Sequence, residues 1–152
     1  TLKYSNLITS HTWNVGAVSY EETNLQTSVN EEKKETWDGK IGLMNVTDYV
    51  KASTNSVCTS VNAYQYNGNS SCYNKSDTHN WIFASLGSTH PWTIAPFSNS
   101  NANDVFGVHS DGYLASGNAY YSNGVAPVFF LKSNITLSGT GTLNNPYMAT
   151  LS

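Results

Sequence analysis

The second half of the chain alternates short apolar runs with turn residues, a pattern typical of short β-strands. Apolar runs at residues 81–84 and 92–94 predict two such strands. Residues 105–109 alternate apolar and polar positions, and turn residues at 110–112 separate them from a further apolar pair, which predicts a β-hairpin. The most apolar run, residues 125–131, predicts a central strand.

The first half is more polar and predicts short helices. All five Glu lie within residues 21–35, where we expect a helix or a long polar loop, with Asn30 as the cap of a short helix. Residues 37–40 predict a turn, residues 41–46 a buried strand, and residues 47–53 a short helix capped by its first or second residue. We therefore expect an α+β domain, with short helices in the N-terminal half and a small antiparallel sheet in the C-terminal half.

A chain of 152 residues has the length of one domain and can bury a sizeable core. We expect residues 1–152 to form that single domain. Trp37, Trp81 and residues 129–131 are the large apolar groups expected in its core. The turn-rich tail at residues 139–147 is expected to return along the edge of the domain.

Only 11% of the residues are charged, whereas globular chains carry about 25%, so the surface must be polar by other means. Asn (19), Ser (20) and Thr (16) supply that polarity, and arginine is absent. A net charge of -3 without arginine argues against a nucleic-acid binder, which needs a basic face and bidentate phosphate contacts. No apolar run approaches the ~18 residues that a membrane-spanning helix requires.

Cys58 and Cys72 enclose a polar, turn-rich segment that cannot bury much apolar surface of its own. A disulfide between them would lower the entropy of the unfolded chain and stabilise the fold by about 3 kcal/mol. The alternative is a pair of free buried thiols in a reducing compartment. An Asn-, Ser- and Thr-rich surface without arginine favours the disulfide and an exported bacterial protein. No Cys or His pair lies at metal-ligand spacing, so no metal or other cofactor is expected.

The sequence carries none of the common catalytic motifs. It has no nucleophile elbow, no phosphate-binding loop and no H-E-x-x-H motif. His79 and His90 could meet around Asp77, although loop histidines in a polar chain are commonly ordinary surface residues. Asp104 or Asp111 could serve a glycan hydrolase, but turn chemistry already accounts for Asp111. We therefore expect a binding protein rather than an enzyme.

Several blocks of the sequence resemble a family of exported surface proteins of gut Firmicutes and related bacteria. The blocks are WDGKIGLM at residues 37–44, TDY at 47–49, WTIAP at 92–96, GVAPVFFLKS at 124–133 and GTGTLNNPY at 139–147. In many members a prepilin-type N-terminal helix precedes the domain. The resemblance therefore implies display on the bacterial cell surface, with an anchor or pilin helix outside this chain as the sole membrane contact.

The order of the blocks is also similar to the C-type-lectin-like superfamily, which includes formylglycine-generating enzymes and proteins diversified by retroelements. This resemblance implies a C-type-lectin-like fold. Members end with a Gly-Val-Arg-Pro-Val strand, and here Ala126 stands at the arginine position. The oxidase branch works through late cysteines or a copper site, whereas both cysteines lie early here, so that activity is not implied. The calcium-binding lectin motif is absent as well, and Asn103 with Asp104 is weak evidence for a calcium site.

Residues 97–125 are rich in Asn, Ser, Gly and Tyr, the mixture that antibody loops use for adaptable recognition. They contain no Lys, Glu, Gln, Met or Trp, although the composition of the whole chain would give about four in this window. Those types are the ones that adenine substitution in AAC codons cannot produce, which favours diversification by a retroelement. The alternative is that any loop in so Asn- and Ser-rich a chain would have this composition.

The leading hypothesis is an exported, non-enzymatic domain that binds a protein or glycan ligand through the loops between residues 92 and 123. The expected ligand-binding residues are Trp92, Asn99, Asn101, Asn103, Phe106, His109, Asp111, Tyr113, Asn118, Tyr120, Tyr121 and Asn123. The alternative is a structural pilin or surface-assembly subunit that forms a pilus or a homo-oligomer. A glycan-active enzyme is the third hypothesis.

Overall fold

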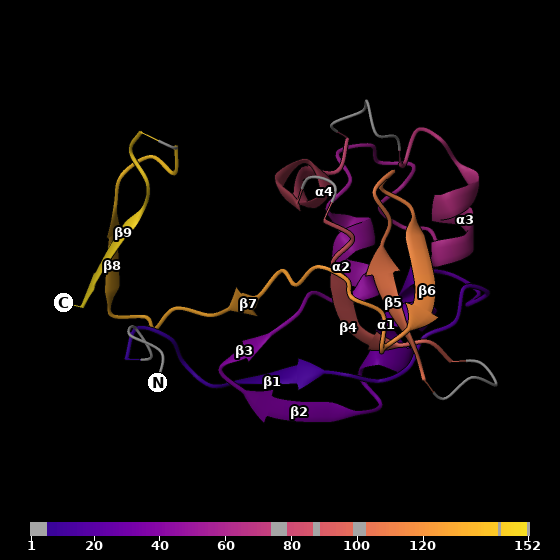
Figure 1. Cartoon of the computed structure of the whole chain (residues 1–152), viewed down its shortest axis with the longest axis horizontal. Helices are drawn as coiled ribbons and strands as arrows, with labels where there is room; N and C mark the ends of the chain where they lie inside the picture. Colours follow the sequence, from indigo (N-terminus) through magenta and orange to yellow (C-terminus); the bar gives the residue numbers. More distant parts are fainter. Residues whose placement is uncertain (1–5, 74–78, 87–88, 99–102, 143, 152) are drawn as a thin grey trace.

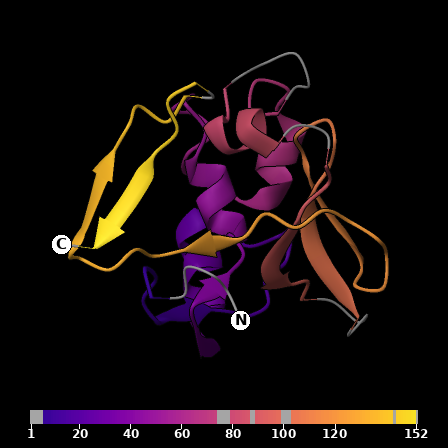
Figure 2. The same cartoon turned by 60° about the vertical axis from the view of Figure 1, so that its left-hand side comes forward.

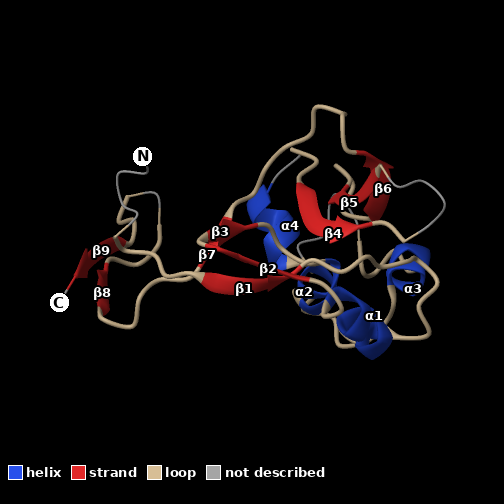
Figure 3. Ribbon diagram, turned by 90° about the horizontal axis from the view of Figure 1, so that it is seen from below, coloured by secondary structure: helices blue, strands red, loops and turns tan. Residues whose placement is uncertain are grey.

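The computed structural model describes residues 6–73, 79–86, 89–98, 103–142 and 144–151, which form a mixed α/β fold with short helices and small antiparallel sheets (Figure 1, Figure 3). The helices are α1 (Leu25–Glu32), α2 (Val46–Lys51), α3 (Ala63–Gly68) and α4 (Trp81–Leu86). The strands are β1 (His11–Asn14), β2 (Thr36–Gly39), β3 (Ile41–Gly42), β4 (Trp92–Pro96), β5 (Asp104–Val108), β6 (Leu114–Asn118), β7 (Val128–Phe129), β8 (Ile135–Ser138) and β9 (Met148–Leu151). Short helices and small antiparallel sheets agree with the expected α+β class, but the expected division into halves is wrong, because β1–β3 lie in the N-terminal half and α4 lies in the C-terminal half.

A three-stranded antiparallel sheet in the order β4–β5–β6 forms one side of the fold. β5 and β6 make a regular hairpin that begins at the pair Val108 and Leu114. The turn between them contains Gly112, whose φ of 89° is open to glycine without steric cost. β4 runs antiparallel to β5, with a break in register inside the strand. The hairpin and the strand predicted at residues 92–94 are both confirmed.

Helices α2 and α3 contact this sheet through β4 and β6, and the core lies between helices and sheet (Figure 1, Figure 2). Alternation along the strands turns Phe106, Val108 and Leu114 into the core and leaves Gly107 and Ala115 on the opposite face. The buried apolar cluster consists of Val18, Leu25, Met44, Val46, Tyr49, Val50, Cys58, Ala63, Tyr66, Cys72, Phe83, Ala95, Phe106, Val108 and Leu114.

Asn80 is a buried polar residue that joins three parts of this core. Its side-chain amide donates to the backbone oxygen of Tyr49 at 2.8 Å and to the hydroxyl of Tyr66 at 3.0 Å. Its Oδ1 accepts hydrogen bonds from the backbone N–H groups of Ile82 and Phe83 and so caps the N-terminus of α4. The strand predicted at residues 81–84 is wrong. These residues form α4 instead, because the Asn80 cap and the contact of Phe83 with the core favour a helix.

The helix predicted in the acidic N-terminal segment exists as α1, but it begins earlier than predicted. Asn24 caps it by accepting a hydrogen bond from the N–H of Thr27 at 3.0 Å, so Asn30 lies inside the helix. The second predicted helix is confirmed as α2. Its cap is Asn45, whose N–H donates to the carboxylate of Asp48 at 3.3 Å.

The apolar run at residues 125–131 is not a central strand. Only its residues in β7 belong to a strand, and β7 pairs with β3 alone. The strand predicted at residues 41–46 shortens to β3 because α2 begins at Val46, so no long partner strand is present for the apolar run. Val125 and residues 129–131 are accordingly exposed rather than buried.

Trp37 and Trp81 were expected in the core, and both are exposed, at 50% and 62%. Trp37 lies in β2, where a turn was predicted, and its ring covers Gly39 of the same strand. Trp81 opens α4, whose core contact is made by Phe83 instead. Tyrosines therefore occupy the central positions that tryptophan was predicted to fill, and Tyr49 is fully buried.

The turn-rich tail does not return along the edge of the domain, as was predicted. β8 and β9 pair with each other and form a hairpin that lies apart from the rest of the fold (Figure 1, Figure 3). Just before this hairpin, the chain is held by the N-terminal segment. The N–H of Thr9 donates to the oxygen of Phe130, and the N–H of Lys132 donates to the oxygen of Leu7, both at 3.0 Å.

Cys58 and Cys72 form the predicted disulfide, with their Cα atoms 5.5 Å apart and both side chains buried in the core. The bond closes the polar loop that contains α3 and is consistent with a secreted protein. None of the helices in the described part of the chain has the length and hydrophobicity that crossing a bilayer requires.

Candidate functional site

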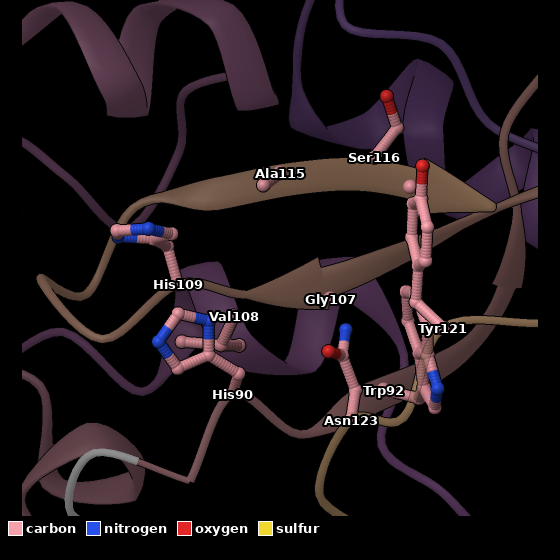
Figure 4. Close-up of a pocket in the computed structure, with 10 residues that line it drawn as sticks. His90, Trp92, Gly107, Val108, His109, Ala115, Ser116, Tyr121 and Asn123 are labelled. Atoms are coloured by element: carbon pink, nitrogen blue, oxygen red, sulfur yellow. The ribbon is translucent and has the colours of Figure 1, made fainter. Parts of the chain in front are cut away.

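A pocket of about 190 Å³ lies on the face of the β4–β5–β6 sheet that points away from the core (Figure 4). Trp92 and Tyr121 stand on one side, His90 and His109 stand on the other, and Asn123 lies between them. Small residues of β5 and β6 form the floor. The lining residues are His90, Trp92, Gly107, Val108, His109, Ala115, Ser116, Gly117, Tyr121 and Asn123.

Glycines in the floor allow the indole of Trp92 to extend across two strands. A Cβ atom at Gly107 would lie 3.2 Å from Cε3 of Trp92, and one at Gly117 would lie 3.5 Å from Cη2 of the same ring. The same position at Gly117 lies 3.8 Å from Cδ2 of Tyr121. The two aromatic rings therefore share one glycine floor, and a larger side chain at Gly107 would displace the indole.

The histidine side of the pocket continues into a row of aromatic rings. His90 meets His109 edge to face at 4.6 Å, His109 stacks on Tyr113 at 4.3 Å, and Tyr113 meets Tyr73 at 5.8 Å. Nδ1 of His109 lies 3.4 Å from the backbone nitrogen of Asp111, whose N–H can donate to it, and 3.5 Å from the carboxylate of the same residue. Desolvation raises the pKa of the Tyr113 phenol, with a further contribution from the carboxylate of Asp111.

His90 has a backbone conformation that is unusual for a residue with a side chain. Its φ is 47°, in the left-handed region, and such residues persist where the surrounding structure holds them. Here Gly124 supplies the restraint, because its N–H donates to the oxygens of Thr89 and His90 at 3.0 and 3.1 Å. The N–H of Trp92 in turn donates to the oxygen of Gly124 at 3.0 Å. This network fixes His90 and Trp92 on opposite sides of the pocket.

A second hollow lies at the other end of the β5–β6 hairpin. Its lining residues are Pro96, Asn103, Asp104, Val105, Asn118, Ala119 and Tyr120. Tyr120 connects it to the first pocket, since its ring centroid lies 4.7 Å from that of Tyr121. A hydrogen bond with Tyr121 raises the pKa of the Tyr120 phenol.

The expected ligand-binding residues fall into five groups. Trp92, His109, Tyr121 and Asn123 line the first pocket, and Asn103, Asn118 and Tyr120 line the second hollow. Asp111 and Tyr113 contact His109 from behind. Phe106 is a correction: it is fully buried between Tyr20 and Phe97 and presents no surface to a ligand. Asn99 and Asn101 lie outside the described residues.

Sequence reasoning missed several members of the pocket, above all His90, which it paired with His79 and Asp77. Asp77 lies outside the described residues, and the structure brings His90 to His109 instead. The available signal was the His-Pro dipeptide directly before a predicted strand. Gly107, Ala115, Ser116 and Gly117 were missed because small residues within a strand give no sequence signal of a pocket floor.

Asp104 and Asp111 do not form a pair of catalytic carboxylates. Asp104 opens β5 and Asp111 follows its end, so the length of the strand separates them by at least about 13 Å. Paired glycosidase carboxylates stand about 5–9.5 Å apart. Among the described residues, no group of three or more His, Cys, Asp or Glu side chains is arranged to hold a metal ion. The polar groups and aromatic faces of the pocket are suited to binding.

Comparison of the chain with known protein families, with curated proteins and with solved structures gave no match.

Proposed function

We propose that the chain is an exported, non-enzymatic ligand-binding domain of C-type-lectin-like architecture, displayed on a bacterial cell surface. The observation that carries the proposal is the first pocket, where Trp92, His109, Tyr121 and Asn123 converge from separate segments. Concave sites with aromatic walls and a few convergent polar groups are the usual form of ligand sites. The disulfide between Cys58 and Cys72 supports export.

The two neighbouring tyrosines are suited to act as anchors for a ligand. Tyr120 and Tyr121 are 75% and 55% exposed, although they follow directly on β6 of a regular hairpin. Tyrosine gives large contact area at a small entropic cost, and rigid support reduces that cost further. Aromatic side chains in such positions carry much of the binding energy of known interfaces.

Diversification of this surface by a retroelement is part of the proposal. The two hollows draw most of their lining from residues 97–125, the window without Lys, Glu, Gln, Met or Trp. Variable positions would then coincide with ligand-contacting positions, whereas His90 and Trp92 would form an invariant side. Sequencing the neighbouring DNA tests this, because a reverse-transcriptase gene and an adenine-rich template repeat must accompany a diversified window.

An array of glycans and bacterial or host surface proteins, probed with the labelled chain, tests ligand binding. We expect binding to at least one class of spots and its loss in the double variant Tyr120→Ala, Tyr121→Ala. The matched control is Tyr64→Ala, which removes an equally exposed tyrosine (66%) from helix α3. Equal loss in the control, or no binding to any spot, would contradict the proposal.

A structural assembly subunit is the second candidate, and one observation favours it. Phe129, Phe130 and Leu131 are consecutive and exposed, and the β8–β9 hairpin beyond them carries exposed Leu137 and Met148. Exposed apolar strands with open edges are common contact sites between subunits. Sedimentation velocity over a range of concentrations separates the two functions, because an assembly subunit must form larger species that Phe129→Asp abolishes.

A further inference from the structure

The chemistry of the first pocket indicates which ligand it accepts, provided that the proposed binding function holds. The residues that line it include no Lys, Arg, Asp or Glu. The carboxylate of Asp111, which is not among the lining residues, lies 3.5 Å from Nδ1 of His109. We propose that this pocket binds one neutral sugar ring, a hexopyranose at the end of a glycan.

The aromatic side of the pocket offers what the apolar face of a sugar ring requires. Trp92 is partly exposed above its glycine floor, and Tyr121 stands beside it with more than half of its surface exposed. Aromatic faces carry a partial negative charge, and the C–H groups on one face of a pyranose carry a partial positive charge. A sugar ring laid against these two side chains therefore gains both apolar burial and an electrostatic match.

The middle and the opposite side of the pocket offer polar groups that can bond to ring hydroxyls. Asn123 presents an amide with donors and an acceptor, and no hydrogen bond joins this side chain to another described residue. Nδ1 of His109 faces the N–H and the carboxylate of Asp111, and no hydrogen bond joins its Nε2 to another described residue, so Nε2 is available to a sugar hydroxyl. His90 adds a second imidazole, 4.6 Å away between ring centroids. Hydroxyl groups satisfy such a mixed set because each can donate and accept.

The size of the pocket and the residue types in its lining argue against three other classes of ligand. Its volume of about 190 Å³ is smaller than the 300–1,000 Å³ or so that drug-sized ligands occupy, so it holds one ring rather than a chain. An acidic sugar or a phosphate would find no Lys or Arg in the lining. An aromatic side chain of a protein ligand would fit the aromatic wall, but would bury Asn123 and the histidines without partners.

Saturation-transfer NMR on the full chain tests the proposal. The probes are the methyl pyranosides of glucose, galactose, mannose and N-acetylglucosamine, with glucuronate and N-acetylneuraminate as acidic sugars. We expect transfer to the ring C–H protons of at least one neutral sugar, with a millimolar Kd. Tyr121→Ala and Asn123→Ala should each weaken that binding about tenfold or more. Ala115→Leu fills the floor without touching a polar group and should abolish it, whereas Tyr64→Ala on helix α3, outside both hollows, should change it less than twofold.

Three outcomes would overturn the sugar proposal. These are no transfer to any neutral sugar, transfer to acidic sugars alone, or binding that Tyr121→Ala, Asn123→Ala and Ala115→Leu all leave unchanged. The proposed function fails separately. If the chain captures a protein on the array through Tyr120 and Tyr121 but binds no sugar, the binding function stands and the sugar specificity is wrong.

Discussion

The side chain of Asn67 pairs with both backbone polar groups of Leu114, as a neighbouring β-strand would. Its Oδ1 accepts a hydrogen bond from the N–H of Leu114 at 2.9 Å, and its Nδ2 donates to the oxygen of Leu114 at 2.6 Å. Asn67 belongs to α3 and Leu114 begins β6. The contact therefore fixes the strand that supplies part of the pocket floor to a helix of the disulfide-closed loop.

Replacing Asn67 by Ala should destabilise the protein and loosen β6. The variant leaves the N–H and oxygen of Leu114 without these partners, which should lower the free energy of unfolding by about 1–3 kcal/mol. Urea unfolding measures the loss, and amide hydrogen exchange at Leu114 should become faster. Tyr64→Ala on the same helix removes an exposed ring and should change stability by less than about 0.5 kcal/mol. Equal stability of the two variants would contradict this role of Asn67.

Glu32 should make stability fall as pH rises, which is the opposite of an ordinary surface carboxylate. It is buried, and its carboxylate accepts hydrogen bonds from the N–H and the hydroxyl of Thr47 at 3.0 and 2.5 Å. Burial raises its pKa above the value of 4.5 for a free side chain, and the bonds to Thr47 offset only part of that effect. The folded protein thus favours the protonated acid. This contribution is complete below pH 4.5 and is lost as pH rises through the folded pKa.

The variant Glu32→Gln removes this titration and keeps an oxygen that can accept from Thr47. Urea unfolding between pH 4 and pH 8 should show the wild type losing stability relative to the variant as pH rises, with a constant difference above the folded pKa. Glu31→Gln is the matched control, because Glu31 is its neighbour on α1 and forms a surface ion pair with Lys34. A wild-type advantage that grows with pH would show that the carboxylate is favoured in its charged form.

Local chemistry explains which elements could be predicted from the sequence. The β5–β6 hairpin follows from alternation and a glycine turn, and the disulfide follows from two cysteines around a polar loop. The apolar runs that form α4 and β7 were misassigned because apolar content alone does not show which other segment a run packs against or pairs with. For α4 the decisive partner was Asn80, which is a cap and a core residue at once.

The sequence predicted some residues of the candidate pocket and missed others, again because it does not show which segments meet in space. Composition pointed to residues 97–125, and His109, Tyr121 and Asn123 of that segment meet Trp92 in one pocket. The prediction did not apply strand parity, so Phe106 was included although it alternates with Gly107 and points into the core. Parity could have corrected this. The convergence of loops before β4 and after β6 could not be read from the sequence, because it depends on backbone hydrogen bonds between segments more than 30 residues apart.

Loss of the disulfide should weaken the fold without abolishing its architecture. The double variant Cys58→Ala, Cys72→Ala releases a loop closed over 14 residues of sequence, which should lower the free energy of unfolding by about 3 kcal/mol. Urea unfolding in the absence of reductant measures the difference. Reductant should destabilise the wild type by a similar amount and leave the double variant unchanged. A wild type that is indifferent to complete reduction would contradict the stabilising role of the bond.

Glycine at position 90 should stabilise the chain relative to alanine at the same position. Both variants remove the ring that meets His109, but Ala retains the cost of a φ of 47° and Gly does not. His90→Gly should therefore be more stable than His90→Ala by about 1 kcal/mol. Thermal or urea unfolding of the pair checks this. An equal or lower stability of the glycine variant would mean that the left-handed backbone at this position carries no strain.

Removal of the β8–β9 hairpin should leave the body and its pocket intact. Every residue of the buried core cluster precedes the hairpin, and the hairpin lies apart from the body (Figure 1, Figure 3). A chain that ends after Ser133 should keep its near-ultraviolet circular dichroism and lose less than about 1 kcal/mol of unfolding free energy. A chain that ends after Ala126 also loses β7 and the bonds that tie Phe130 and Lys132 to the N-terminal segment, and should be clearly less stable. If the chain that ends after Ser133 is already unfolded, the hairpin contributes to the core and the body does not fold without it.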